Sequence, residues 1–158
     1  MDFLLTLFGE NMGLVFGGFG VAIAMIGGGI GSARGVGLAG EAAAALVREK
    51  PELFGQAMVL QLLPATQGLY GFVIALIMLL SLQQGMDVSQ GWYYIACALP
   101  VAFTGYTSAP AQARVSVAGM QILTKRPENS TQGIVFSAMV ETYAILGFVI
   151  SLLMFLLV

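Results

Sequence analysis

The sequence predicts an all-α membrane protein with four transmembrane helices, built as two tandem helical hairpins in parallel duplication. Three observations carry the helical part of this prediction. The chain is 58% hydrophobic and only 9% charged and contains no His, whereas a soluble domain carries about 25% charged residues. Four apolar stretches can each cross a hydrocarbon core of ~30 Å, which takes about 20 residues. The second half of the sequence also repeats the first.

The four apolar stretches are expected at Met12–Val47, Phe54–Leu82, Trp92–Leu123 and Gln132–Val158. The first and third exceed one bilayer thickness, so we expect both to continue as helix into the aqueous phase. The segment Met1–Phe8 lacks a basic region, and we therefore expect no cleaved signal peptide.

The first stretch is rich in glycine. Spacings of four residues recur at Gly13 and Gly17 and again at Gly27, Gly31 and Gly35. Small residues at this spacing let helix backbones approach closely within a membrane. The first helix is therefore predicted to be crowded by neighbours on more than one side.

Basic residues are confined to two of the connections and their approaches, those between spans 1 and 2 and between spans 3 and 4. They are Arg34, Arg48, Lys50, Arg114, Lys125 and Arg126. By the positive-inside rule these two loops are cytoplasmic and both termini face outward. We expect a multi-pass integral protein of a bacterial plasma membrane.

The sequence matches itself when it is shifted so that Pro51 falls on Pro127. The same shift places Gln56 on Gln132, and Gly71-Phe72-Val73-Ile74 on Gly147-Phe148-Val149-Ile150. Each repeat holds two spans, an even number, so both copies have the same orientation, unlike the inverted repeats of many transporters. Residues 1–82 and 83–158 are predicted as the first and second hairpin of one structural unit.

A single carboxylate, Glu141, lies in the last apolar stretch, which contains no Lys or Arg. An ionisable group at that depth is costly and marks a candidate functional site. It must be protonated, bind a mobile cation or pair with a positive group of another chain. In the repeat Glu141 aligns with Ala65, and Gln112 aligns with Val36, so two hairpins supply one charged site. This pattern indicates ion movement across a membrane.

Polar residues line one face of the second span. Leu63, Thr66, Gln67 and Tyr70 follow the spacing i, i+3, i+4 and i+7, which places them together on a helix. Pro64 has no N–H and disturbs the preceding turn, so nearby backbone oxygens are expected to become available as ligands.

The third span carries a matching polar stripe that includes Gln112. Counted from the cytoplasmic loops, Thr66, Gln112 and Glu141 all lie roughly 18–21 Å deep, so they can converge on one point. Carboxylate, amide, hydroxyl and backbone oxygens suit a hard cation. Alternatively, Thr66, Gln67 and Gln112 only join helices by hydrogen bonds, but a carboxylate at the same depth favours an ion site.

Three segments resemble the c/K-type proteolipid rotor subunit of V-type ATPases. They are Gly40-Glu41-Ala42-Ala43-Ala44-Ala45, Gln61-Leu62-Leu63-Pro64-Ala65-Thr66-Gln67-Gly68-Leu69-Tyr70-Gly71-Phe72 and Met139-Val140-Glu141-Thr142-Tyr143-Ala144-Ile145-Leu146-Gly147. The chain is most similar to the bacterial sodium-translocating branch. That resemblance implies a Na⁺ site made by Leu63, Thr66, Gln67, Gln112 and Glu141. It also implies that Tyr70 hydrogen-bonds Glu141 and locks the site.

The resemblance further implies that copies of the chain form a rotor ring within an ATP-driven, cation-translocating rotary ATPase. The chain itself would catalyse nothing and would need no organic cofactor. Its expected partners are a stator membrane subunit with a buried arginine, central-stalk subunits at the cytoplasmic loops, and membrane lipids, with no nucleic acid.

Two other functions remain open at this point. One is a proton-translocating version of the same rotor ring, although Gln67 and Gln112 favour sodium because a proton needs no coordination shell. The other is a self-contained small membrane transporter or pore. A purely structural scaffold would leave Glu141 unexplained.

Overall fold

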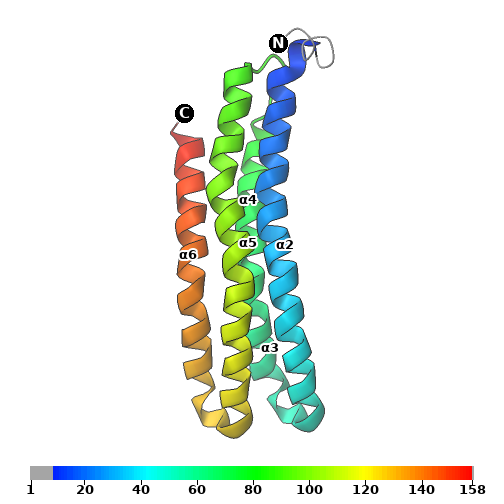
Figure 1. Cartoon of the computed structure of the whole chain (residues 1–158), viewed down its shortest axis with the longest axis vertical. Coiled ribbons are helices and arrows are strands. Elements are labelled where there is room, and N and C mark those ends of the chain that lie inside the picture. The colour runs from blue at the N-terminus through cyan, green and yellow to red at the C-terminus, as the bar shows by residue number, and fades with distance from the viewer. Residues whose placement is uncertain (1–8, 158) are drawn as a thin grey trace.

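The computed structural model describes residues 9–157, which form four long helical rods lying side by side (Figure 1). The expected absence of a signal peptide in Met1–Phe8 and the predicted span end at Val158 fall outside these residues. Three rods are the helices α2 (Met12–Glu49), α5 (Val88–Lys125) and α6 (Ser130–Leu156); the fourth joins α3 (Phe54–Leu62), the 3₁₀ turn η3 (Leu63–Ala65) and α4 (Thr66–Leu80). Shorter 3₁₀ turns are η1 (Gly9–Asn11), η2 (Pro51–Leu53) and η4 (Pro127–Asn129).

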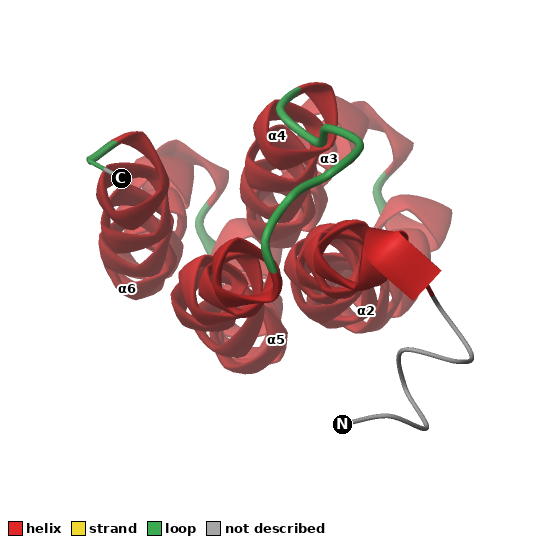
Figure 2. Cartoon of the chain, turned by 90° about the horizontal axis from the view of Figure 1, so that it is seen from above, coloured by secondary structure: helices red, strands yellow, loops and turns green. Residues whose placement is uncertain are grey.

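The rods form two hairpins of the same orientation. The α2–α3 and α5–α6 connections lie at one end of the molecule, and the described chain ends lie toward the other end (Figure 1). Seen from above, α4 lies against both α2 and α5, whereas α6 packs against α5 at the outer side (Figure 2). Thus α2 and α5 form one layer, and α4 and α6 form the other.

Three of the rods are long and apolar enough to cross a membrane, namely Met12–Glu49, Pro51–Leu80 and Pro127–Leu156. The prediction of four such helices is therefore confirmed for three, because α5 is not among them. Hydropathy counts a side chain whichever way it points, and α5 turns Ser108, Gln112 and Ser116 into the protein interior.

Glycines allow α2 to approach two neighbours at once. A Cβ atom at Gly31 would collide with the Gly105 carbonyl on α5. On the other side, a Cβ atom at Gly28 would lie 2.5 Å from the Gln67 carbonyl on α4. The crowding predicted from the glycine spacing is confirmed, and it fixes α2 against both α5 and the polar face of the second rod.

Replacing Gly31 by Ala is expected to destabilise the helical bundle by about 2 kcal/mol, because overpacking against a backbone that cannot yield costs about 1–3 kcal/mol. The measurement is the thermal midpoint of helix loss by circular dichroism in detergent. Gly55→Ala is the matched control, since a Cβ atom at Gly55 meets nothing within 4 Å. Equal midpoints for the two variants would contradict the close α2–α5 approach.

Close contacts also hold α6 against α5 on both sides of Glu141. Toward the hairpin loop, Gly133 packs on Gly119, where an added Cβ atom would lie 2.7 Å from the opposite Cα atom. Toward the other end, Gly147 packs against Thr104. The segment of α6 that carries the carboxylate is therefore held against α5 by close contacts on both sides of Glu141 along the helix.

Candidate ion-binding site

The Glu141 carboxylate is half-buried where α6 meets α4 and α5. The Tyr70 hydroxyl donates a hydrogen bond of 2.5 Å to Oε1, and the Gln112 amide lies 3.4 Å from Oε2. Among the side chains that the structure describes, the only ion pair joins those of Arg48 and Glu49, which are exposed. Two neutral donors, and no cationic side chain of the described chain, thus hold the carboxylate.

Two fully buried amides continue the network inward. Gln67 Nε2 donates to Gln112 Oε1 at 2.6 Å, and neither side chain has any exposed surface. Gln112 Nε2 also lies 3.2 Å from the Ser137 carbonyl oxygen. Buried amides are costly unless they are hydrogen-bonded, so these contacts fix both side chains beside Glu141.

The break in the second rod supplies the remaining oxygens. Pro64 lies in the 3₁₀ turn between α3 and α4. At this turn the Thr66 hydroxyl donates to the Leu63 carbonyl at 3.0 Å and lies 3.4 Å from Gln67 Oε1. The disturbed helical turn expected at Pro64 is confirmed, and it presents a backbone carbonyl and a hydroxyl to the same network.

The structure therefore brings together every predicted site residue. A continuous series of polar contacts runs through Leu63, Thr66, Gln67, Gln112, Glu141 and Tyr70.

Sequence reasoning missed two participants. Ser32 on α2 accepts a hydrogen bond of 2.7 Å from the backbone N–H of Gly68, next to Gln67. The Ser137 carbonyl accepts from Gln112. Ser32 could have been predicted as a participant, because it is a hydroxyl-bearing residue within the glycine-rich run. No sequence feature marks a backbone carbonyl inside a regular helix.

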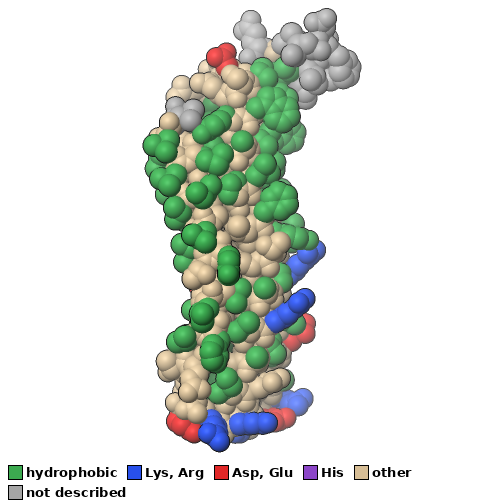
Figure 3. Space-filling view, turned by 60° about the vertical axis from the view of Figure 1, so that its left-hand side comes forward, with side chains coloured by type: hydrophobic (Ala, Val, Ile, Leu, Met, Phe, Trp, Pro, Cys, Tyr) green, Lys and Arg blue, Asp and Glu red, His purple; other side chains and the backbone are tan. Residues whose placement is uncertain are grey.

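The surface around the carboxylate is apolar. Leu69, Met139, Tyr143 and Leu146 are 60%, 63%, 66% and 61% exposed. Hydrophobic side chains spread along this side of the molecule, while acidic and basic side chains gather mainly in the half that holds the hairpin loops (Figure 3). A charged Glu141 at this surface would face hydrocarbon, which is unfavourable unless the charge is neutralised.

The donor set suits a singly charged cation. The described residues contain no group of three or more His, Cys, Asp or Glu side chains that could hold a metal ion. Calcium and zinc sites draw on several charged or imidazole ligands. One carboxylate among neutral oxygens balances one positive charge, which a proton or a monovalent metal ion would supply.

Comparison with known proteins places these features in a family. The pattern of the ATP synthase C-subunit family matches twice, at residues 19–78 and 95–154. The two matches start at corresponding points of the internal repeat and together cover most of the chain. The family pattern is thus present once in each hairpin.

Individual relatives agree with this result. The V-type sodium ATPase subunit K of Enterococcus hirae is 58% identical, over 98% of this chain and 97% of its own length. The A-type ATP synthase subunit K of Methanocaldococcus jannaschii is 36% identical, over 89% of this chain and 62% of its own length. The 16 kDa proteolipid of the V-type proton ATPase of Rattus norvegicus is 24% identical over 88% of this chain and 90% of its own length. The chain is therefore a member of the ATP synthase C-subunit family and has the form of a tandem, two-hairpin proteolipid.

Proposed function

We propose that this chain is the rotor subunit of a V-type ATPase and carries Na⁺ across the membrane at Glu141. One observation carries the proposal: the carboxylate has no cationic partner among the described residues, yet it is joined to a buried set of neutral oxygen groups. The proposed ligands are the Leu63 carbonyl, Thr66, Gln67, Gln112 and Glu141. Tyr70 holds the carboxylate in its locked form. The relative that is 58% identical is a subunit of a sodium ATPase.

Charge neutrality explains how such a site travels through lipid. With Na⁺ bound, the carboxylate and the ion together are close to neutral and tolerate the apolar surface around them. An empty, ionised Glu141 does not, because an isolated charge in hydrocarbon is strongly disfavoured. The site therefore empties only where another positive charge replaces the ion, and an arginine of the stator subunit fulfils that role.

Copies of the chain form a ring, with α2 and α5 inside and α4 and α6 facing lipid. ATP hydrolysis by other subunits turns the ring past the stator, so ions enter through one half-channel and leave through another. Residues 1–82 and 83–158 act as its two hairpins, and all four rods span the membrane. The Arg48–Glu52 and Lys125–Glu128 loops face the cytoplasm and dock the central stalk, which leaves both termini outside. The bacterial relative supports a plasma-membrane location.

Carbodiimide labelling of the purified ring tests the sodium site. A hydrophobic carbodiimide reacts with buried, protonated carboxyl groups, so we expect labelling of Glu141 that Na⁺ suppresses and K⁺ at the same concentration does not. Peptide mass spectrometry locates the label. Glu41, which is exposed, serves as the negative control and should stay unlabelled whether or not sodium is present.

The possible outcomes separate the rival functions. Labelling that sodium leaves unchanged would identify a proton rotor, in which Gln67 and Gln112 only pack the helices. Absence of labelling would contradict an ion-carrying role for Glu141. Sodium flux through vesicles that contain this chain and no other subunit would instead identify a self-contained transporter or pore.

A further inference from the structure

The two hairpin loops have the same backbone structure. At the end of α2, Lys50 has φ −135° and ψ 74°, and at the end of α5, Arg126 has φ −143° and ψ 79°. The N–H of Lys50 bonds to the Leu46 carbonyl at 2.9 Å, and the N–H of Arg126 bonds to the Ile122 carbonyl at 2.7 Å. These two basic residues also coincide in the sequence repeat. Each therefore holds the same position in its own hairpin.

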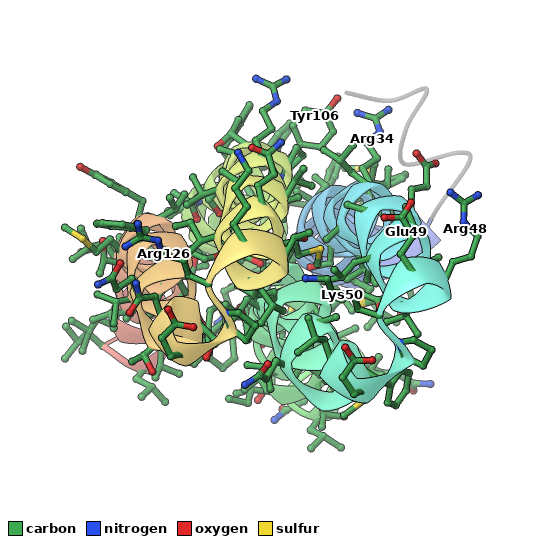
Figure 4. All side chains as sticks on the ribbon, turned by 90° about the horizontal axis from the view of Figure 1, so that it is seen from below. Arg34, Arg48, Glu49, Lys50, Tyr106 and Arg126 are labelled. Atoms are coloured by element: carbon green, nitrogen blue, oxygen red, sulfur yellow. The ribbon has the colours of Figure 1, made fainter. Side chains whose placement is uncertain are left out.

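Lys50 fastens the two hairpins together inside one chain. Its Nζ atom donates to the Thr124 carbonyl at 2.5 Å, across from the first hairpin to the last turn of α5. The last carbonyls of a helix lack partners within the helix and favour a positive charge. Lys50 thus caps α5 and lies between the two loops (Figure 4).

Arg126 has no corresponding acceptor in the part of its own chain that the structure describes. Its exposed side chain makes no hydrogen bond or ion pair among residues 9–157. It lies toward α6, whereas Arg48, at the end of α2, lies on the opposite side of the molecule (Figure 4). The repeat shift that carries Lys50 onto Arg126 carries Thr124 back onto Arg48, so the matching acceptor is the Arg48 carbonyl.

We propose that α2 of a second copy packs against α5 and α6 of the first. The register of this contact is the one in which α5 packs against α2 and α4 within a single chain. Arg126 then caps α2 of the second copy by donating to its Arg48 carbonyl. The partner is another molecule of this chain, and the inference rests on the ring proposed above. What it adds is the register of the contact and a basic residue that closes it.

The outer sides of α2 and α5 fit this register. Within one chain, Gly35 approaches Ala109, and an added Cβ atom would lie 2.8 Å from that carbonyl oxygen. In the repeat, Gly35 corresponds to Ala111, and Ala109 corresponds to Ala33. The equivalent contact between copies therefore joins Ala111 of one copy to Ala33 of the second. Both are exposed, and each lies two residues, about 200° of helix rotation, from the face that packs within the chain. Small exposed side chains therefore stand where the second close approach is required.

In the same register, the junction between two copies contains no charged side chain at the positions that match the ion site. The positions that match Gln67, Tyr70 and Gln112 are Tyr143, Leu146 and Val36, and the position that matches Glu141 is Ala65. The junction between copies thus carries no counterpart of the carboxylate or of either amide. Each chain contributes one ion site, which lies at the junction between its own hairpins.

Cysteine cross-linking of the full-length protein tests the register. In a Cys97→Ala background, the double variant Ala33→Cys with Ala111→Cys should give a ladder of covalent oligomers on non-reducing gels after mild oxidation. A disulfide needs Cα atoms about 4.4–6.8 Å apart, so only close opposition permits it. The matched control is Ala33→Cys with Ala138→Cys, because Ala138 is exposed on α6 at the position that matches the 53% exposed Leu62 on the lipid side. This control pair should yield no ladder.

Native mass spectrometry of the same samples distinguishes failure of the proposed register from failure of the proposed ring. Intact oligomers without the ladder would overturn the register and leave the ring standing. A protein that is monomeric in mild detergent would overturn both.

The role of Arg126 has its own measurement. Arg126→Gln should lower by several degrees the temperature at which the detergent-solubilised oligomer dissociates, and Arg126→Lys should restore it, because Lys occupies the matching position in the first hairpin. Lys125→Gln removes a neighbouring exposed charge and should have no such effect. A decrease of the same size for Lys125→Gln would show a general charge effect and overturn the capping role.

Discussion

Replacing Glu141 by Gln is expected to abolish sodium transport by the assembled rotary ATPase while leaving the helices folded. The variant keeps the shape of the side chain and removes its charge. Loss of a charged partner costs about 3 kcal/mol, which corresponds to about 100-fold weaker ion binding. A neutral side chain at this position also could not pair with the arginine that is proposed for the stator. The measurement is uptake of radioactive sodium by vesicles that contain the complete enzyme.

Glu41→Gln provides the matched control for this experiment. Glu41 is an exposed carboxylate on α2, outside the polar network, so the same chemical change there should leave sodium uptake within about twofold of the unmodified enzyme. Sodium uptake by Glu141→Gln at a rate close to that of Glu41→Gln would contradict the assignment of Glu141 as the ion carrier.

Replacing both buried amides, as Gln67→Leu with Gln112→Leu, is expected to separate sodium binding from the carboxylate itself. Removing the two partners together avoids leaving one amide buried without a hydrogen bond, which would cost about 1–3 kcal/mol. Carbodiimide should still label Glu141. The sodium concentration that protects it should rise by at least about 100-fold, since two oxygen ligands worth about 1.5 kcal/mol each are lost.

Ser108→Ala is the control for the amide variant. Ser108 lies one helical turn from Gln112, is buried, and its hydroxyl has no hydrogen-bond partner among the described residues. Its removal takes away a polar atom from the same stripe without touching the network, so sodium protection should stay unchanged. An unchanged sodium requirement in the double amide variant would point to a site that binds protons alone.

The helices and the common level of the site residues along them were predictable from the sequence because both depend on spacing along one chain. The first helix was expected at Met12–Val47 and lies at Met12–Glu49. Counting from the loops placed Thr66, Gln112 and Glu141 at one level, and the structure joins all three through a single network. A rise per residue that is nearly constant makes such estimates reliable between helices of the same orientation.

Contacts that depend on how each helix is rotated about its axis were harder to predict from the sequence. Which face α2 turns toward α4 decides whether Ser32 meets Gly68, and glycine spacing alone permits several rotations. Hydropathy likewise leaves α5 out of the helices that are apolar enough to span a membrane, because the polar side chains that lower its hydropathy include Ser108, Gln112 and Ser116, which pack inward. In both cases the missing information is the direction of a side chain, which packing between rods determines.

The contacts that hold α6 on either side of Glu141 limit how the site can release its ion. With Gly133 packed on Gly119 and Gly147 packed on Thr104, turning the helix about its axis would drive side chains into the α5 backbone. What remains free is the glutamate side chain, together with the Tyr70 hydroxyl that holds it. Side-chain rotations take picoseconds to nanoseconds, whereas collective helix motions take microseconds or longer. Loading and unloading of the site therefore require only a local movement of side chains and no rotation of α6.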